Sequence, residues 1–218
     1  MKVMLLAAGI GSRMRPLSDR LPKPLMRVHG KPLLQYHLEN LAQAGYTEII
    51  INHSRMGWMI EEFCGDGGQF GVHIRYSPEG EQPLETGGGI LQAMHLLGDE
   101  PFVAISADLF TDYDFSLLHG KSVDLAYLVL VDNPVDYPGG DFCLQESQLC
   151  KDRGRRLTYG NIGILRPELF QGCTQSSFPL GPLLHQAVAS MRVQGEYFSG
   201  GWVNVGSPEQ LAQLNRGS

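Results

Sequence analysis

The first half of the chain alternates between short apolar runs and longer amphipathic segments. Apolar runs bounded by turn residues predict buried strands at 3–7, 48–52, 72–76 and 102–107. Apolar positions spaced three and four residues apart predict helices at 32–44, 56–64 and 86–97. The regular alternation of strand and helix predicts an α/β fold with a Rossmann-like, doubly wound, mostly parallel mixed sheet.

The second half of the chain is less regular, and we expect antiparallel strands there. Its pattern predicts strands at 124–131, 141–149, 157–165 and 197–205, and helices at 181–190 and 208–215. We see neither a linker nor a repeat between the halves. The chain is therefore expected to form one domain over 1–218, with two halves that meet at about residue 120.

Composition narrows the class of protein. The formal net charge of -6 argues against a nucleic-acid partner. The apolar runs fall short of the roughly 20 residues that a membrane helix needs, and the first is too short for a signal peptide. We therefore expect a cytoplasmic protein without a membrane partner. The cysteines include no CxxC pair, which argues against zinc, but Cys143 and Cys150 are spaced to face each other across a hairpin as reduced thiols.

The first predicted strand runs into a loop that is small, cationic and stiff: LLAAGIGSRMRPLSDRLPKPL. Small residues let backbone N–H groups approach a phosphate, arginine and lysine add positive charge, and prolines hold the backbone in place. These residues are Ala7, Ala8, Gly9 and Gly11, then Arg13, Arg15 and Lys23, with Pro16, Pro22 and Pro24. The loop therefore predicts a site for phosphate groups.

Two better-known glycine-rich loops do not fit this segment. A dinucleotide-binding loop needs GxGxxG, but Met14 stands at the third glycine position, and Pro16 prevents an immediate helix. A Walker loop needs GK[ST], which the segment lacks. A nicotinamide-dependent oxidoreductase is therefore disfavoured.

The loop resembles the L-A-A-G-x-G-x-R-x-x-P…P-K-P motif of the sugar-1-phosphate nucleotidyltransferases. Other segments resemble later motifs of that family, in order: PLETGGGI, SADLF, GNIGIL and WVNVGSPEQL. The likeness is greatest to short bacterial members that use UTP and N-acetylmuramate 1-phosphate, and RYSPEGEQPLETGGGI, FTDYDF and LVLVDNP carry it. The resemblance extends over nearly the whole chain.

The resemblance implies a fold of the nucleotidyltransferase (GT-A-like) type and a reaction between two phosphorylated substrates. A sugar 1-phosphate would attack UTP, giving a nucleotide-sugar and pyrophosphate, in peptidoglycan recycling. With a second pKa of about 6, the attacking phosphate is already ionised at neutral pH and needs no general base. Catalysis would consist of positioning and charge neutralisation. The first half would bind the nucleotide and the second half the sugar phosphate.

The resemblance also implies roles for individual residues. Arg13 would hold the departing pyrophosphate, Lys23 would bridge the α-phosphate and the sugar phosphate, and Asp108 would ligate Mg²⁺. The implied nucleotide-binding residues are Ala7, Ala8, Gly9, Gly11, Arg13, Lys23, Gly87 and Gly88, the last two by letting the base and ribose approach closely. The implied sugar-binding residues are Gly140, Asp141 and Asn161.

One departure from the family pattern opens an alternative. Asn204 stands where the family usually has its second metal-binding aspartate, and asparagine supplies an oxygen ligand without negative charge. The chain could therefore be a catalytically weak regulator that binds nucleotide-sugars, although Arg13, Lys23 and Asp108 argue for an enzyme. A guanylyl- or thymidylyltransferase acting on mannose or glucose 1-phosphate is the alternative within the family.

Overall fold

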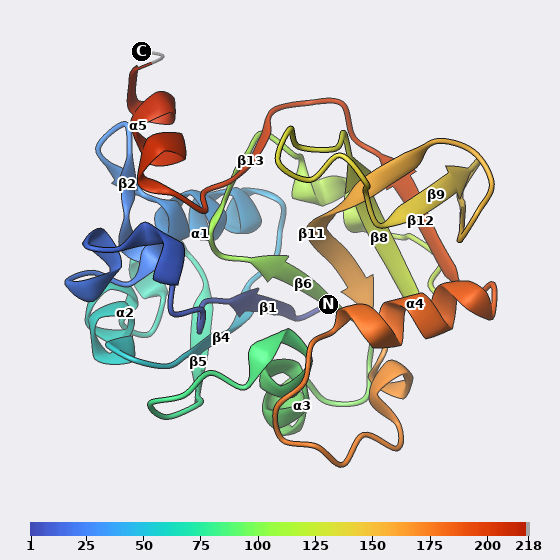
Figure 1. Cartoon of the computed structure of the whole chain (residues 1–218). Helices are drawn as coiled ribbons and strands as arrows, with labels where there is room; N and C mark the ends of the chain where they lie inside the picture. Colours follow the sequence, from blue (N-terminus) through green and yellow to red (C-terminus); the bar gives the residue numbers. More distant parts are fainter. Residues whose placement is uncertain (217–218) are drawn as a thin grey trace.

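Within residues 1–216, which the computed structural model describes, nine strands form one mixed sheet (Figure 1). The first part of the sheet has four parallel strands in the order β5, β4, β1 and β6. Their bounds are Val3–Leu6 for β1, Glu48–His53 for β4, His73–Pro78 for β5 and Phe102–Ser106 for β6. The parallel first half confirms the prediction from the alternating pattern.

Helices cover both faces of this parallel part. α1 (Leu33–Gln43) and α2 (Gly57–Cys64) pack on one face, and α3 (Glu85–Leu97) packs on the other. Met4 of β1 belongs to the core under α3, whereas its two neighbours in the strand belong to the core under α1 and α2. Because both of their faces are buried, the central strands β1 and β6 are apolar without alternation.

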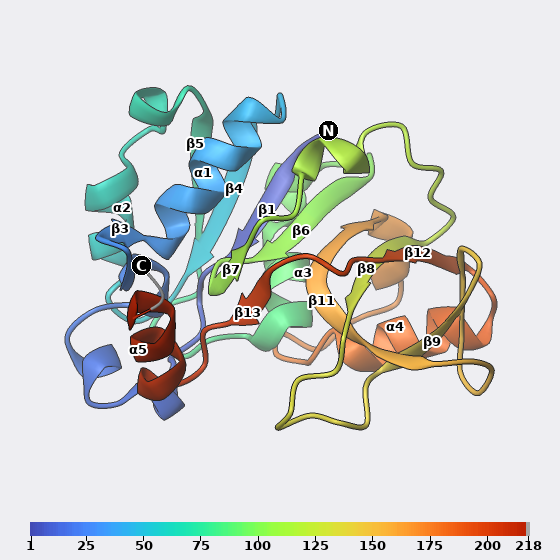
Figure 2. The ribbon, with the colours of Figure 1, turned by 90° about the horizontal axis from the view of Figure 1, so that it is seen from above.

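The second half of the sheet closes on itself. β11 runs antiparallel to β6, the order continues through β8, β12, β10 and β9, and β9 pairs again with β11. The bounds are Ala126–Val131 for β8, Phe142–Gln145 for β9, Gln148–Cys150 for β10, Arg156–Leu165 for β11 and Val193–Tyr197 for β12. These five strands make a small closed barrel beside the parallel strands (Figure 2). The sheet is therefore mixed rather than mostly parallel.

Two local predictions have different outcomes. The expected strand at 197–205 is wrong: β12 ends at Tyr197, and a separate strand, β13 (Trp202–Asn204), pairs with β7 (Leu109–Thr111). Gly200 lies in the break, where an added Cβ would come 2.7 Å from a carboxylate oxygen of Asp112. The expected strand at 141–149 divides into β9 and β10. The hairpin prediction is confirmed, because these two strands place Cys143 directly opposite Cys150, both as free thiols.

The remaining elements surround the sheet. α4 packs on the core of the barrel, and α5 lies beside the loop that follows β1 (Figure 2). The bounds are Gly181–Ala189 for α4, Pro208–Arg216 for α5, Arg27–Val28 for β2 and Lys31–Pro32 for β3. Short 3-10 helices occupy Ser12–Met14, Leu17–Asp19, Lys23–Leu25, Gly68–Phe70, Phe115–Leu118 and Pro167–Phe170. Among residues 1–216, each helix is too short or too polar to cross a membrane.

Four polar side chains form a hydrogen-bonded group around Glu196 of β12. The carboxylate of Glu196 accepts hydrogen bonds from Tyr113 at 2.5 Å, Lys121 at 2.7 Å and Tyr127 at 3.1 Å. Burial would raise the pKa of Glu196, but the hydrogen bonds from Lys121 and Tyr113 outweigh it, so that its pKa is lowered. Glu196 is therefore held as a carboxylate.

His37 on α1 makes stability depend on pH. Burial lowers the pKa of its imidazole from 6.5 to about 4, although Asp108 and a backbone hydrogen bond to Leu109 act in the opposite direction. Between these pH values the unfolded chain binds a proton that the folded chain does not. We therefore expect the free energy of unfolding to fall as the pH drops from 6.5 to about 4, by about 3 kcal/mol in all.

Urea unfolding of wild type and His37→Leu across this pH range measures the effect. The variant has no imidazole to protonate, so its stability should vary less with pH than that of the wild type by about the same amount. If the free energy of unfolding depended on pH in the same way in both proteins, the pKa of His37 would not be lowered in the folded state.

Candidate active site

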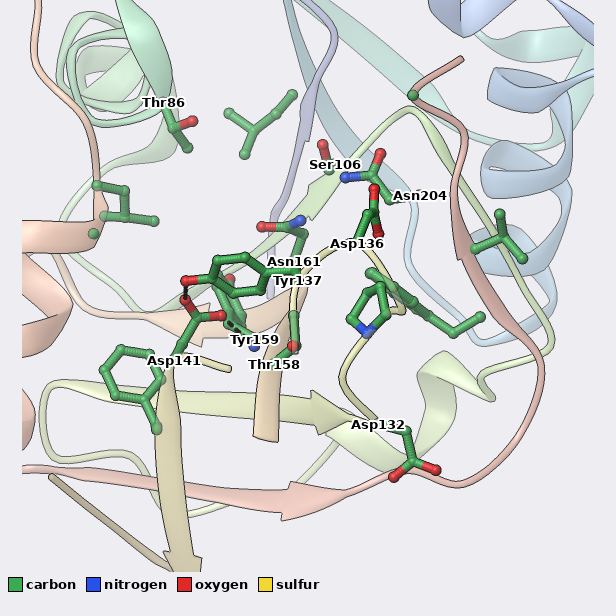
Figure 3. Close-up of a pocket in the computed structure, with 18 of the residues that line it drawn as sticks. Thr86, Ser106, Asp132, Asp136, Tyr137, Asp141, Thr158, Tyr159, Asn161 and Asn204 are labelled. Atoms are coloured by element: carbon green, nitrogen blue, oxygen red, sulfur yellow. Dashed lines mark hydrogen bonds between the residues drawn. The ribbon is translucent and has the colours of Figure 1, made fainter. Parts of the chain in front are cut away.

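Two adjoining cavities open at the carboxyl ends of β1 and β6, as expected for parallel strands in an α/β sheet. The larger, about 1000 Å³, is lined by residues of the parallel strands and of the barrel (Figure 3). The smaller, about 290 Å³, is lined by the loop after β1 and the loop before α3. Leu6, Thr86 and Ser106 line both cavities, so the two spaces meet at the ends of these strands.

The loop after β1 contributes to both cavities. Ala7, Ala8, Gly9 and Lys23 line the smaller cavity, and Arg13 lines the larger one. A Cβ added to Gly206 would come 3.2 Å from the guanidinium of Arg13, so that side chain lies against the segment after β13. The structure therefore brings the predicted loop residues close together, but divides them between the two adjoining cavities.

Gly11 has a different position. Its φ of 65° is left-handed, and its carbonyl accepts hydrogen bonds from the backbone of Met14 at 2.8 Å and from the hydroxyl of Ser18 at 2.8 Å. Gly11 therefore makes the turn that folds the loop back toward Lys23. Contact of Gly11 with a nucleotide remains a prediction.

An ion pair lines the smaller cavity, next to Ser106, which lines both cavities. Lys23 donates to Oδ2 of Asp108, and the hydroxyl of Ser106 donates to Oδ1 at 2.8 Å. The side chains of Lys23 and Asp108 are only 12% and 19% exposed, so water screens their attraction weakly. The sequence predicted both residues at this site, but not their contact with each other.

Strand pairing brings Asn204 next to Asp108. In the antiparallel pair of β13 and β7, Asn204 lies opposite Leu109, and the N–H of Val205 donates to the carbonyl of Asp108 at 3.0 Å. Oδ1 of Asn204 is buried and has no hydrogen-bond partner among the described residues. Figure 3 shows Asn204 and Ser106 on the same side of the larger cavity.

The donor atoms at this point suit a hard divalent cation. A carboxylate and an unpartnered amide oxygen are the oxygen ligands that Mg²⁺ takes, with water and phosphate oxygens completing its shell. Residues 1–216 contain no cluster of three histidine, cysteine, aspartate or glutamate side chains that would bind a metal alone. A cation here would therefore depend on ligands that a substrate brings.

Two of the predicted sugar-binding residues, Asp141 and Asn161, line the larger cavity (Figure 3). The carboxylate of Asp141 accepts from the hydroxyl of Tyr137 at 2.9 Å and from the N–H of Tyr159 at 2.8 Å. Asn161 has a left-handed backbone with φ 55°, at an irregularity in the pairing of β11 with β8. This conformation costs energy in most residues, and asparagine adopts it more readily than most.

The third, Gly140, does not line the cavity. Its φ is 58°, and an added Cβ would come 2.6 Å from Oδ1 of Asn133 and 2.9 Å from the carbonyl of Leu157. The structure thus corrects the reason for this glycine: it permits a tight turn immediately before Asp141. Sugar contact through Gly140 remains a prediction.

Gly87 and Gly88 have a different partner from the one expected. Both N–H groups donate to the carbonyl of Phe178, at 3.0 and 3.1 Å. A Cβ added to Gly87 would come 2.4 Å from the ring of Phe178, and one added to Gly88 would come 2.3 Å from the carbonyl of Ser176. The chain's own segment, rather than an open cavity, therefore occupies the space that these glycines leave.

The same region holds residues that the sequence analysis missed. Glu85 and Thr86 line the smaller cavity, and Glu85 has a left-handed backbone with φ 59°. Asn52 and Glu79 also line it and are hydrogen-bonded to each other at 2.5 Å. Asn52 follows three isoleucines in a buried strand, and a polar residue at the end of such a strand is a signal for a site at that edge of the sheet.

The sequence as a whole is similar to known proteins. A family model described as nucleotidyl transferase matches residues 2–131. The chain belongs to the nucleotidyl transferase family. It is 46% identical over 222 residues to the N-acetylmuramate alpha-1-phosphate uridylyltransferase of Neisseria meningitidis serogroup B, covering 98% of this chain and 96% of that protein.

A more distant relative agrees with this family, and a solved structure shares the fold. The chain is 32% identical to the Caulobacter vibrioides protein of the same name, covering 94% of this chain and 92% of that one. A putative glucose-1-phosphate thymidylyltransferase from Bacillus anthracis superposes with a TM-score of 0.84 at 19% identity, covering 99% and 94% of the two chains. At that identity the superposition supports the fold alone.

Proposed function

We propose that this protein transfers a uridylyl group from UTP to N-acetylmuramate 1-phosphate, giving UDP-N-acetylmuramate and pyrophosphate. The observation that carries the proposal is the meeting of two unlike cavities at Ser106, with Lys23 and Asp108 lining the smaller cavity and Asn204 lining the larger. This arrangement suits a reaction between two phosphorylated substrates. The choice of substrates rests on the likeness to the Neisseria protein over nearly the whole chain. Such a reaction belongs to cytoplasmic recycling of peptidoglycan sugars.

The two cavities divide the substrates between the halves of one nucleotidyltransferase domain of the GT-A-like type. The smaller cavity, in residues 1–120, takes the nucleotide, whose phosphates lie against the backbone of Ala7, Ala8 and Gly9. The larger cavity, mostly in residues 121–218, takes the sugar phosphate, with Asp141 and Asn161 facing the sugar hydroxyls. The phosphates of both substrates then meet beside Lys23.

Positive charge is the main requirement of this reaction. The attacking phosphate is an anion at neutral pH, as is the triphosphate that it approaches, so no residue has to remove a proton. Lys23 shifts from Asp108 to bridge the α-phosphate and the sugar phosphate. Arg13, which lines the larger cavity, holds the β- and γ-phosphates where they extend past the junction of the two cavities. Both cations stabilise charge that moves onto the departing pyrophosphate.

Asp108 and Asn204 are the residues that would hold Mg²⁺. The buried, unpartnered Oδ1 of Asn204 and the carboxylate of Asp108 fit such an ion. When bound, Mg²⁺ neutralises phosphate oxygens and keeps the triphosphate in one orientation. Ser106 orients the carboxylate of Asp108 through its hydroxyl hydrogen bond.

The substrate prediction is tested by pyrophosphate release. Four nucleoside triphosphates are combined with N-acetylmuramate, N-acetylglucosamine, glucose and mannose 1-phosphates in the presence of Mg²⁺. We expect the highest kcat/KM for UTP with N-acetylmuramate 1-phosphate. Faster turnover of GTP with mannose 1-phosphate, or of dTTP with glucose 1-phosphate, would refute the substrates but not the reaction. Nucleotide-sugar binding without turnover of any pair would favour the regulator.

The roles of the two cations are tested by Arg13→Ala and Lys23→Ala. Each variant loses a charge that acts on the transferring phosphates, so kcat should fall by roughly 100-fold or more. Arg15→Ala is the matched control, because Arg15 is exposed and pairs with Asp19 at 3.3 Å on the outside of the same loop. A kcat close to that of the wild type in either variant would remove that residue from the proposed mechanism.

The neutral metal ligand is tested by a Mg²⁺ titration at saturating UTP. Asn204→Asp adds a negative charge at similar size, so it should lower the Mg²⁺ concentration that gives half-maximal activity. Asp108→Asn should abolish most activity, because it removes the carboxylate. An unchanged Mg²⁺ requirement in Asn204→Asp would mean that Asn204 does not act on the ion.

A further inference from the structure

Three hydrogen bonds in series connect the two loops around the smaller cavity. The N–H of Ala7 donates to Oδ1 of Asn52 at 2.8 Å, and Nδ2 of Asn52 donates to Oε1 of Glu79 at 2.5 Å. The other carboxylate oxygen of Glu79 accepts from the N–H of Leu84 at 2.6 Å. The series starts at the loop that follows β1, which contains Ala7 to Lys23 and is called the phosphate-binding loop below. It passes through the end of β4 and ends at the residue before Glu85.

The polarity of this series is fixed. The N–H of Ala7 can only donate, so the amide of Asn52 must turn its oxygen toward Ala7 and its nitrogen toward Glu79. The N–H of Leu84 can also only donate, so the atom of residue 79 that faces it, Oε2 of Glu79, must accept. Only a side chain with two acceptors satisfies both neighbours at position 79.

The packing around the bridge leaves little freedom. Asn52 is 2% exposed, and an added Cβ at Gly89 of α3 would come 2.3 Å from Oε1 of Glu79 and 2.7 Å from Nδ2 of Asn52. Next along the chain from β4, the hydroxyl of Ser54 donates to the carbonyl of Ala8 at 2.6 Å. The end of β4 therefore holds two successive residues of the phosphate-binding loop.

We propose that Asn52 and Glu79 are positioning residues that hold the two loops at a fixed separation around the nucleoside triphosphate. The inference rests on the proposed function in one respect, that the smaller cavity takes the nucleotide. Neither side chain needs to contact the reacting atoms. The bridge sets the backbone of Ala7 to Gly9 on one side of the nucleotide and Glu85 with Thr86 on the other, before the substrate arrives.

Reversing the polarity of the bridge tests this role. In Glu79→Gln, the new amide cannot accept from both Asn52 and Leu84, so one bond is lost. In Asn52→Asp, two carboxylates face each other. In the double variant, the carboxylate at 52 accepts from Ala7 and from the amide at 79, whose oxygen accepts from Leu84. This rebuilds all three bonds with the same total charge.

We expect each single variant to raise KM and Kd for UTP by about tenfold, the effect of losing one buried hydrogen bond. The double variant should return both constants to within about threefold of the wild type, as a coupled pair requires. KM for the sugar 1-phosphate should stay within about twofold of the wild type in all three proteins, because neither Asn52 nor Glu79 lines the larger cavity. Pyrophosphate release gives KM, and calorimetry with UTP gives Kd.

Two further variants separate positioning from stability. Gly89→Ala inserts a methyl group against the bridge while favouring the helix itself, so KM for UTP should rise although the thermal midpoint falls little. Glu196→Gln weakens the buried polar group of the barrel, so the thermal midpoint should fall while KM for UTP stays unchanged. An equal rise in KM for UTP in Glu196→Gln would show that the effect is only structural.

The outcomes distinguish this inference from the proposed function. If the wild type uses a different triphosphate, the proposed base is wrong, and the bridge variants are measured with that triphosphate. If the wild type uses UTP but KM is unchanged in Glu79→Gln and Gly89→Ala, the positioning role is refuted. The positioning role would also be refuted if both single variants raised KM for UTP and the double variant did not lower it again.

Discussion

The rest of the structure depends on the burial of β1 between two parallel neighbours and under helices on both faces. A strand in that position cannot carry polar side chains along its length without a large cost in desolvation. Its polar residues are therefore confined to its carboxyl end and the following loop, and the same holds for the site residues of β4 and β6. Ala7, Asn52 and Asp108 come from three different strands and meet because the strands run in the same direction.

Much of this arrangement could be predicted from the sequence, because burial on both faces leaves unbroken apolar runs that are easy to recognise. The closed barrel could not, since its closure depends on β9 pairing with β11, and short half-buried strands do not specify their partners. The division of 197–205 into two strands was missed for a local reason. Apolar residues flank Gly200 and Gly201 on both sides, and the pattern alone does not show that the chain turns there.

At the site, the loop after β1 was predictable because its chemistry is unusual for its position: cations and small residues directly after a buried strand. Asp108 was predicted only through the resemblance of SADLF to a family motif. Glycines were less informative. A glycine is required wherever something approaches the backbone closely, and the sequence does not say whether that is a ligand or the chain itself. For Gly87 and Gly88 it is the segment at Phe178, and for Gly89 it is the Asn52–Glu79 bridge. Hydrogen bonds between residues 27 positions apart leave no local pattern at all.

The charges at the junction of the cavities explain why a neutral residue at position 204 is compatible with the site. Without substrate, the positive charge of Lys23 balances the single carboxylate of Asp108 in a place that water reaches poorly. A second carboxylate at 204 would leave one negative charge there without a partner, and burial makes such a charge costly. In the proposed reaction, phosphates would offer Lys23 a stronger partner and would bring the anionic oxygens that a divalent cation needs. In the proposed reaction, the charges of Lys23 and Asp108 would therefore balance before the substrates bind, and a metal held by Asp108 and Asn204 would depend on the triphosphate for its other ligands.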